Sequence, residues 1–388
     1  MKVVIAPDSF KECLTAIDVA KALAAGVRAA DGSAVIDLCP MADGGEGTVE
    51  AMVSATGGQV RSAAVTAPMG EVVQASFGLL GTSAGSHAAL TAVIEMAAAS
   101  GLALVEPPRR NPMLATTYGT GELILAALDA GAEVVLIGIG GSATVDGGCG
   151  CAQGFGVRFI DAAGRCCPGG LGGGGLSAIR HVDLSGRDAR LSTARIGVAC
   201  DVTNPLTGPN GAAAVYGPQK GATPEMVALL EAGLANLAEV IRRDLGLDVE
   251  HLAGAGAAGG LGAGLVAFAG GRLQRGVEIV AVAVGLARRL AGADLCITGE
   301  GHFDRQSLSG KTAVGVARLA AAARVPVVCI PGQAAGGADC GGLFIDVRPL
   351  AAGEVTPAEA MARAGELLTA RAAEAVADFL ARGRRRGL

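Results

Sequence analysis

The sequence predicts an α/β protein of two domains, and three observations lead to this: its length, an N-terminal strand-helix-strand series, and a similar series near its C-terminus. The chain has 388 residues, well above the roughly 100 to 150 residues of a common single domain. Residues 2–6 are an apolar run typical of a buried strand. Thr15 followed by Asp18 resembles a helix N-terminus, and residues 34–39 resemble a second strand. This order predicts two parallel strands.

The C-terminal part repeats this alternation, whereas the middle of the chain differs. In the middle, residues 72–80 and 88–94 predict an antiparallel hairpin. We therefore expect one domain from residues 1–60 plus 285–388, interrupted by a second domain at residues 61–284. The elements expected in the C-terminal part are a strand at 294–298, a helix at 313–323, strands at 326–330 and 343–347, and a helix that begins after Thr356.

Composition excludes several classes of protein. Lys and Arg number 31 against 36 Asp and Glu, which argues against a nucleic-acid binder because such proteins neutralise phosphates with basic residues. The uncharged segment at residues 253–271 is rich in glycine, so we expect a soluble loop and helix rather than a membrane span. The N-terminus lacks an export signal, and the cysteines lack a disulfide or zinc spacing. A cytoplasmic protein is expected.

Acidic residues follow several of the predicted strands. A carboxylate at the C-terminal end of a strand can hold Mg²⁺ or accept a proton from an attacking hydroxyl. The alternative is that each acid caps a turn or a helix. Several acids at one sheet edge favour a cation or phosphoryl site, and we expect the loops of the first two strands to be neighbours. The acids are Asp8, Asp43, Asp201 and Glu300.

A glycine-rich loop follows a strand predicted at residues 134–137. Residues 138–143 read GIGGSA, and the backbone N–H groups of such a loop can cradle phosphates. A plain tight turn is the alternative. The loop also matches the GxGxxA form of a dinucleotide fingerprint, with Asp161 at the position of a ribose-binding acid, although the glycines that follow would weaken the required helix. A second segment, residues 254–259, matches the GxGxxG form of this fingerprint, but it has no apolar strand before it.

The segment SGKT at residues 309–312 ends like a P-loop. Arg305 stands where that motif requires glycine, so we do not expect a P-loop nucleotide triphosphatase. Lys311 can contact phosphate or remain a solvated lysine. The four histidines have no zinc-binding spacing, and no ligand role is assigned to them.

Eight short segments of the sequence form a recognisable series. They are APDSFK (6–11), PMADGGEGT (40–48), VIEMAAASGL (93–102), TTYGTGE (116–122), GIGGSATVDGG (138–148), ACDVTNPLTGPNGA (199–212), GPQKGA (217–222) and TGEGHFDRQSLSGK (298–311). Taken together, these segments resemble the bacterial type-1 glycerate kinase family, and they span nearly the whole chain in the family's order. The chain departs from the family pattern at Glu12 and Cys13, where Gly and Ser are usual, and at Val145, where Asn is usual.

The resemblance implies ATP-dependent phosphorylation of D-glycerate, with the 2-hydroxyl favoured as acceptor. It also implies a flavodoxin-like parallel-sheet domain interrupted by a second α/β domain of restriction-endonuclease-like topology. ATP would bind with Mg²⁺ against the glycine-rich loop. The expected site residues are Asp43, Asp8 and Lys11 for catalysis; Ser9, Lys11 and Glu46 for glycerate; Gly140, Gly141, Ser142 and Lys311 for the nucleotide; and Asp201 and Glu300 for the metal.

Two other classes of function remain open at this point. The dinucleotide fingerprint favours a nicotinamide-dependent oxidoreductase acting on a small hydroxy acid. A flavodoxin-like scaffold is also compatible with a ligand-binding regulator, because a fold does not fix an activity. The expected partners are small molecules, glycerate and ATP, with no nucleic acid and no membrane. Both a monomer and a homodimer remain open.

Overall fold

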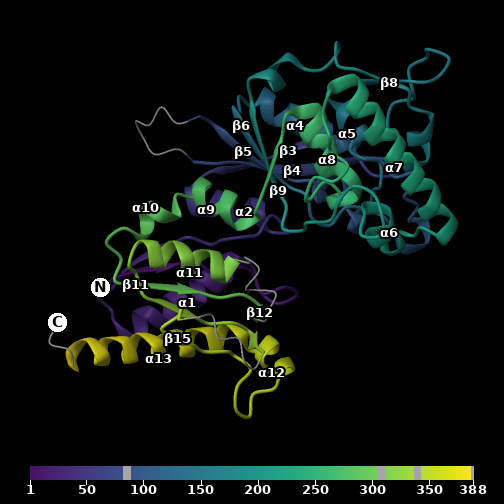
Figure 1. Cartoon of the computed structure of the whole chain (residues 1–388). Helices are drawn as coiled ribbons and strands as arrows, with labels where there is room; N and C mark the ends of the chain where they lie inside the picture. The colour runs from purple at the N-terminus through teal and green to yellow at the C-terminus, as the bar shows by residue number, and fades with distance from the viewer. Residues whose placement is uncertain (82–88, 304–311, 336–341, 386–388) are drawn as a thin grey trace. The chain divides into compact units, whose positions relative to one another are not determined.

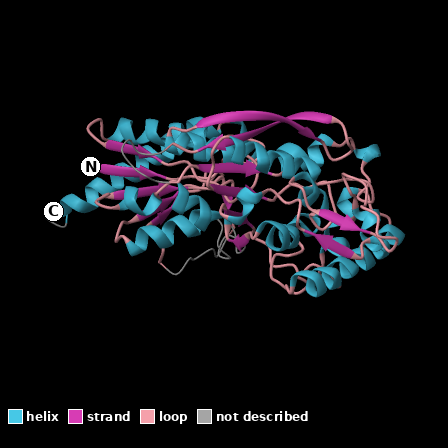
Figure 2. Cartoon of the chain, turned by 90° about the horizontal axis from the view of Figure 1, so that it is seen from above, coloured by secondary structure: helices cyan, strands magenta, loops and turns pink. Residues whose placement is uncertain are grey.

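The computed structural model describes residues 1–81, 89–303, 312–335 and 342–385, and it is a mixed α/β structure (Figure 1). The chain divides into two compact units. The first unit comprises Met1–Asp43, Glu50–Gly57 and Val277–Leu388, and the second comprises Gly44–Val49 and Gly58–Gly276. Strands in both units are flanked by helices (Figure 2). Among the described residues, no helix combines the length and apolar character needed to cross a membrane.

The first unit is built on a five-stranded sheet with the order β15-β13-β11-β1-β2. Every pair of neighbouring strands in it is parallel, as the strand-helix-strand pattern predicts. A short parallel pair, β12 and β14, lies beside the main sheet in the same unit. The strands are β1 (Lys2–Ile5), β2 (Val35–Leu38), β11 (Leu295–Thr298), β12 (His302–Phe303), β13 (Val327–Cys329), β14 (Gln333–Ala334) and β15 (Asp346–Val347).

Helices cover both faces of this sheet, with α11 on one face and α1 with α13 on the other (Figure 1). Helices α1 and α13 pack closely at Gly26, where an added Cβ would lie 2.2 Å from the carbonyl oxygen of Thr369. Thr15 caps α1, and Thr356 forms a reciprocal capping box with Glu359, as expected from the sequence. The helices are α1 (Ala16–Ala30), α2 (Thr48–Thr56), α9 (Gly276–Ala283), α10 (Leu286–Leu290), α11 (Thr312–Ala322), α12 (Pro357–Ala362) and α13 (Ala364–Arg385).

The second unit is built on a six-stranded sheet with the order β10-β9-β6-β5-β4-β3. Strands β10, β9, β6 and β5 are parallel, whereas β5, β4 and β3 are antiparallel neighbours. The hairpin expected from the sequence is therefore the β4–β5 pair. The strands are β3 (Gln59–Thr66), β4 (Val72–Leu79), β5 (Thr91–Glu95), β6 (Val134–Gly138), β7 (Arg158–Ile160), β8 (His181–Asp183), β9 (Arg195–Ala199) and β10 (Arg272–Gln274).

Helices pack around the hydrophobic core of this unit, which includes Phe159, Leu234 and Phe268. Within α8, Ala258 and Gly259 adopt left-handed backbone angles, so the helix is interrupted there. The helices are α3 (Ala97–Ser100), α4 (Tyr118–Asp129), α5 (Cys149–Gly154), α6 (Ala212–Tyr216), α7 (Pro224–Leu245) and α8 (Ala257–Ala269).

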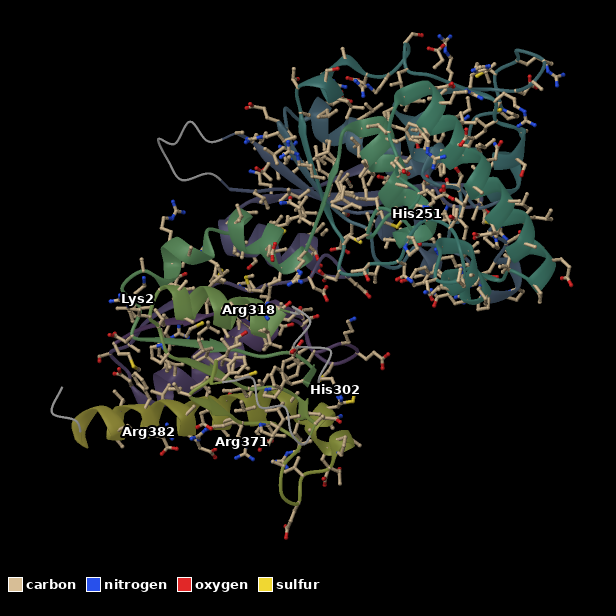
Figure 3. The ribbon with its side chains drawn as sticks, viewed as in Figure 1. Lys2, His251, His302, Arg318, Arg371 and Arg382 are labelled. Atoms are coloured by element: carbon tan, nitrogen blue, oxygen red, sulfur yellow. The ribbon has the colours of Figure 1, made fainter. Side chains whose placement is uncertain are left out.

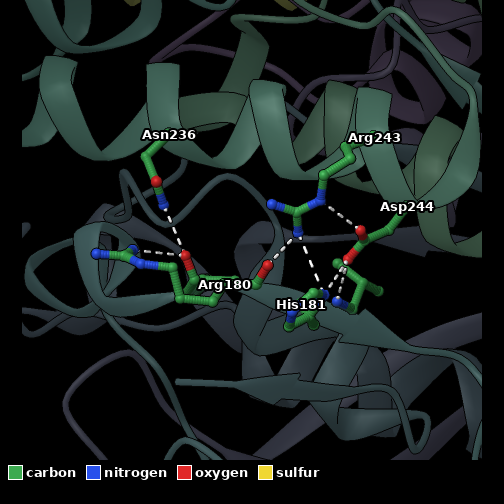
Figure 4. Close-up of polar contacts among 7 residues, drawn as sticks. Arg180, His181, Asn236, Arg243 and Asp244 are labelled. Atoms are coloured by element: carbon green, nitrogen blue, oxygen red, sulfur yellow. Dashed lines mark hydrogen bonds and ion pairs between the residues drawn. The ribbon is translucent and has the colours of Figure 1, made fainter. Parts of the chain in front are cut away.

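Polar side chains on α7 attach it to the chain around β8 (Figure 4). Asn236 donates hydrogen bonds to the carbonyl oxygens of Leu176 (2.9 Å) and Ile179 (3.0 Å). The Asp244 carboxylate accepts a hydrogen bond of 3.0 Å from the backbone N–H of Val182. These bonds satisfy backbone groups that regular secondary structure leaves unpaired, and so they stabilise the connection between α7 and β8.

Candidate active site

In the first unit, the C-terminal ends of the parallel strands gather several loops at one edge of the sheet. The backbone N–H of Asp8, which follows β1, donates to the carbonyl oxygen of Gly299 after β11, at 2.8 Å. The N–H of Met41, which follows β2, donates to Pro7, also at 2.8 Å. The loops that carry Asp8, Asp43 and Glu300 are therefore joined at this edge, where open α/β sheets bind ligands.

Asp8 at this edge has a carboxyl group with a raised pKa. Its carboxylate accepts a hydrogen bond of 2.6 Å from the backbone N–H of Ser9 and another from the hydroxyl of Thr312, the first residue of α11. Burial and the negative charge of Asp43 raise the pKa of Asp8 to about 7, against the effects of these bonds and of Lys11. A carboxyl group with this pKa exchanges a proton near neutral pH, which suits a general base.

The other residues predicted for this unit differ in exposure. Lys11 is exposed on a turn, Ser9 is half-buried beside Asp8, and Glu300 is buried. Lys311 lies outside the described residues. Thr312, which sequence reasoning did not assign, is buried and bonded to Asp8. Its position at the start of a predicted helix, one residue after Lys311, was the available signal.

Glu12, the next residue of this turn, has a left-handed backbone with φ of 59°. Because a Cβ is strained there, Glu12→Gly is expected to stabilise the protein by about 0.5 to 1 kcal/mol, after allowance for the greater entropy of glycine in the unfolded chain. A urea titration measures the change. Glu12→Ala is the matched control, since it removes the charge and keeps the Cβ. An equal gain in stability in both variants would show that loss of the Glu12 charge, and not loss of the Cβ, stabilises the protein.

In the second unit, the candidate phosphate loop and Asp201 extend from neighbouring strands. Gly138, at the end of β6, pairs in register with Ala199, at the end of β9. Gly140 and Asp201 therefore both lie two residues beyond a paired position on adjacent parallel strands. Asp201 is exposed, and its carboxylate accepts a hydrogen bond of 2.9 Å from the backbone N–H of Gly276. Glu46, also in this unit, is exposed.

The loop after β6 is held by backbone hydrogen bonds, but its tip, formed by Gly140 and Gly141, is exposed to solvent. The carbonyl oxygen of Gly141 accepts from the N–H of Leu102 at 2.8 Å, and Ala143 donates to Ser100 at 3.0 Å. Within the described part of the chain, the backbone N–H groups of Gly140, Gly141 and Ser142 donate no hydrogen bond. Both glycines are exposed. Consecutive unpaired N–H groups of this kind are suited to bind phosphate oxygens.

Asp146 anchors the base of the same loop. Its buried carboxylate accepts hydrogen bonds from the N–H and hydroxyl of Thr117 (2.8 and 2.7 Å) and from the N–H groups of Gly148 (3.1 Å) and Gly150 (3.2 Å). Burial raises the pKa of Asp146, whereas these bonds lower it. The side chain of Val145 is also buried, in the hydrophobic core. The departure from the family pattern at Val145 therefore lies away from the open tip.

Lys220 is the second residue that sequence reasoning missed. Its ammonium group donates to the hydroxyl of Ser142 at 2.6 Å and to the carbonyl oxygen of Thr144 at 2.7 Å. Ser142 is thus buried and engaged by Lys220, while the glycines before it form the open tip. The available signal was the segment GPQKGA, in which glycines surround a single lysine.

The structure corrects two expectations. The four strand-end acids do not share one sheet, because Asp201 follows β9 of the second unit and the other three belong to the first. The dinucleotide fingerprint also fails, since α5 is a six-residue helix that begins only at Cys149. Asp161, its expected ribose-binding acid, instead accepts hydrogen bonds from Ala163 and Arg165 of its own turn.

A metal site was predicted at Asp201 and Glu300. Outside the gaps at 82–88, 304–311, 336–341 and 386–388, no three His, Cys, Asp or Glu residues form a group that could hold a metal ion. His251 belongs to the second unit and His302 to the first (Figure 3). Magnesium bound with a nucleotide commonly uses one or two protein carboxylates together with phosphate and water oxygens. Asp201 and Glu300 offer oxygen donors of the required type.

A sheet edge with a perturbed carboxyl group and a glycine loop with open amides are features of enzymes that transfer phosphoryl groups. The model of the glycerate kinase family matches residues 3–381. Over 333 residues the chain is 51% identical to the glycerate 2-kinase of Escherichia coli K12, covering 86% of this chain and 85% of that protein. It is 50% identical to the glycerate kinase of Bacillus subtilis 168 over the same length, with the same coverage.

The fold is similar as well. A Salmonella typhimurium LT2 protein, assigned as a glycerate kinase 2, superposes with a TM-score of 0.89 and 48% identity, over 99% of each chain. The chain therefore belongs to the glycerate kinase family. It is accordingly a kinase that phosphorylates glycerate, and kinases use ATP as donor. Nothing in these comparisons supports the oxidoreductase alternative.

Proposed function

We propose that the chain transfers the terminal phosphoryl group of ATP to the 2-hydroxyl of D-glycerate. The choice of this hydroxyl is supported by the name of the Escherichia coli relative, glycerate 2-kinase. Phosphoryl transfer requires positioning and charge neutralisation more than covalent chemistry from the protein. The observation that carries the proposal is Asp8, because burial and the neighbouring charge of Asp43 raise its pKa to about 7.

Asp8 is the proposed general base, and Asp43 is the alternative. In this role the carboxylate of Asp8 orients the attacking hydroxyl and accepts its proton. Thr312 and the N–H of Ser9 hold that carboxylate in place. Lys11 neutralises the glycerate carboxylate, and Ser9 with Glu46 completes the proposed substrate set.

The proposed nucleotide contacts are the exposed N–H groups of Gly140 and Gly141, together with Ser142 beside them. Without a side chain, the two glycines allow phosphate oxygens to approach the backbone closely. Lys311 is retained as a further proposed phosphate contact, although it lies outside the described residues.

Mg²⁺ is the proposed metal, held by Asp201 or Glu300. A carboxylate ligand fits the preference of this ion for oxygen donors. When bound, the ion would neutralise charge on the transferring phosphate. Asp201 suits this role because it extends from the strand next to the one that carries Gly140.

The finer fold assignments are proposals as well. We propose a flavodoxin-like topology for the first unit, and the strand order of its five-stranded sheet, which renumbered within that sheet reads 2-1-3-4-5, supports it. For the second unit we retain a restriction-endonuclease-like topology, and for the domains residues 1–60 plus 285–388 and residues 61–284. A cytoplasmic enzyme, either monomer or homodimer, completes the proposal.

A phosphorus NMR spectrum of the product tests the regiochemistry. Incubation of the protein with D-glycerate, ATP and Mg²⁺ is expected to yield the resonance of 2-phosphoglycerate. Comparison with authentic 2- and 3-phosphoglycerate identifies the product directly. A spectrum of 3-phosphoglycerate would refute the proposed acceptor and leave the kinase activity intact.

Gly140→Ala tests the nucleotide contacts. An added Cβ at Gly140 has no neighbour closer than 3.7 Å, so the variant is expected to fold normally. The methyl group obstructs phosphate at the open amides and is expected to raise KM for ATP about ten-fold, a loss of about 1.4 kcal/mol, with KM for glycerate unchanged. Steady-state kinetics with each substrate varied in turn measures both constants. Gly365→Ala in α13, with open space around it, is the control.

A further inference from the structure

Lys220 is a buried cation in the second unit, with only 2% of its surface exposed. Removing an ammonium group from water is costly unless hydrogen bonds and a nearby opposite charge compensate for it. Burial lowers the pKa of Lys220 to about 7, and the negative charge of Asp146 opposes this shift. A leucine or methionine would fill the same space without the cost of desolvating an ammonium group. Packing alone therefore does not explain a lysine at this position.

Both hydrogen bonds recorded for the side chain of Lys220 go to the glycine-rich loop and the residue after it. Its Nζ donates to Ser142 Oγ at 2.6 Å and to the Thr144 carbonyl at 2.7 Å. These two acceptors lie directly after the open tip, and Asp146 fixes the residues that follow. Gly147 donates to the carbonyl oxygen of Gly259 at 3.0 Å. The base of the loop is therefore immobilised while its tip is left open.

The backbone around Lys220 is shaped to place it there. Gly221 has φ of 91°, and a Cβ on it would lie 2.4 Å from the carbonyl oxygen of Arg110. A Cβ on Gly217 would lie 2.4 Å from the carbonyl oxygen of Ala213. Both flanking positions thus require glycine, which explains the spacing GPQKG in the sequence.

We propose that Lys220 is a positioning residue for the nucleotide, which holds Ser142 and Thr144 so that the amides of Gly140 and Gly141 stay open to phosphate. This inference rests on the proposed nucleotide contacts. Two effects act together. The hydrogen bonds fix the conformation of the loop before the ligand arrives, which lowers the entropic cost of binding. When Lys220 is protonated, its positive charge also attracts the polyphosphate.

Lys220→Met tests the inference, because it keeps an unbranched side chain and removes the ammonium group. Loss of a charged hydrogen-bonding partner is expected to raise KM for ATP by about ten-fold or more, with KM for glycerate within about two-fold of wild type. Calorimetric titration with magnesium and a non-hydrolysable ATP analogue measures the same loss as an increased Kd. Lys21→Met, on the exposed face of α1, is the matched control and is expected to change neither constant.

Ser142→Ala provides a second variant should Lys220→Met fail to fold. It removes one acceptor of Lys220, so nucleotide affinity is expected to fall while the bond to Thr144 remains. In the double variant the two effects should be less than additive.

Equal increases in both KM values, or an unchanged Kd for the analogue, would overturn the inference. If Gly140→Ala weakens ATP binding and Lys220→Met does not, only Lys220's role fails. If neither does, the proposed nucleotide site itself is wrong.

Discussion

Asp8→Asn is expected to lower kcat for glycerate phosphorylation by a factor on the order of 10² to 10⁴, the usual contribution of a general base. The amide keeps the size of the side chain: its carbonyl oxygen can accept the hydrogen bond from the N–H of Ser9, and its NH2 group can donate to the hydroxyl of Thr312. It cannot accept a proton from the substrate. Steady-state kinetics at saturating ATP and glycerate measures the change, and a nearly unchanged kcat would exclude Asp8 as the base.

The pH dependence separates Asp8 from Asp43. With a pKa of about 7, Asp8 in the wild-type protein is expected to lose activity as the pH falls below neutrality. Asp43→Asn removes the repelling charge, so the acidic limb of the profile should move to lower pH while substantial activity remains. If Asp43→Asn abolishes activity and Asp8→Asn does not, the two roles are exchanged.

The raised pKa of Asp8 also affects stability. Because the folded-state pKa lies above the ordinary aspartate value of 3.8, protonation favours the folded protein. The stabilisation is complete below the unfolded pKa and is lost as the pH rises through about 7. At pH 8 the ionised Asp8 therefore destabilises the folded protein. Asp8→Asn is expected to raise the free energy of unfolding at this pH by about 1 to 3 kcal/mol. Urea titrations at pH 5 and pH 8 should show the gain mainly at the higher pH.

Gly259→Ala is expected to destabilise the protein by about 3 kcal/mol or more and to impair nucleotide binding. Gly259 has φ of 69°, and an added Cβ would lie 1.9 Å from the carbonyl oxygen of Thr144. That atom belongs to backbone, so it cannot move aside like a flexible side chain. The substitution therefore pushes against the loop that Lys220 and Asp146 hold.

Gly270→Ala is the matched control for this variant. Gly270 ends α8 with nearly the same backbone angle, φ of 67°, but an added Cβ there meets no atom within 4 Å. It should cost only about 1 kcal/mol, the conformational strain alone. Urea titration of both variants measures the difference between close packing and strain. Equal costs would show that the contact between Gly259 and Thr144 contributes nothing.

Local patterns in the sequence were sufficient to predict much of the fold. The apolar runs and helix caps led to β1, α1, β2 and the C-terminal elements, because each depends on neighbouring residues. The chain order of strand, helix and strand also led to the parallel pairing of β1 and β2. From that pairing followed the proximity of the loops that carry Asp8 and Asp43.

The contacts of the two anchoring residues could not be predicted in this way. Lys220 is 78 residues from Ser142 along the chain, and Asp146 is 29 residues from Thr117. No local periodicity encodes such contacts. The literal GxGxxG at residues 254–259 is another example, because its glycines allow close packing against three distant segments. Gly254 packs against Cys200, Gly256 against Pro205 and Gly259 against Thr144.

Membership of the glycerate kinase family could be predicted from the order of short motifs, because each motif is a contiguous segment whose residues keep their spacing. The partition of the acids between two sheets was not, because it depends on which distant strands pair. The same holds for the perturbed pKa of Asp8, which arises from burial and from a neighbour 35 residues away in sequence. Charges and hydrogen bonds act through space, and the folded chain alone sets those distances.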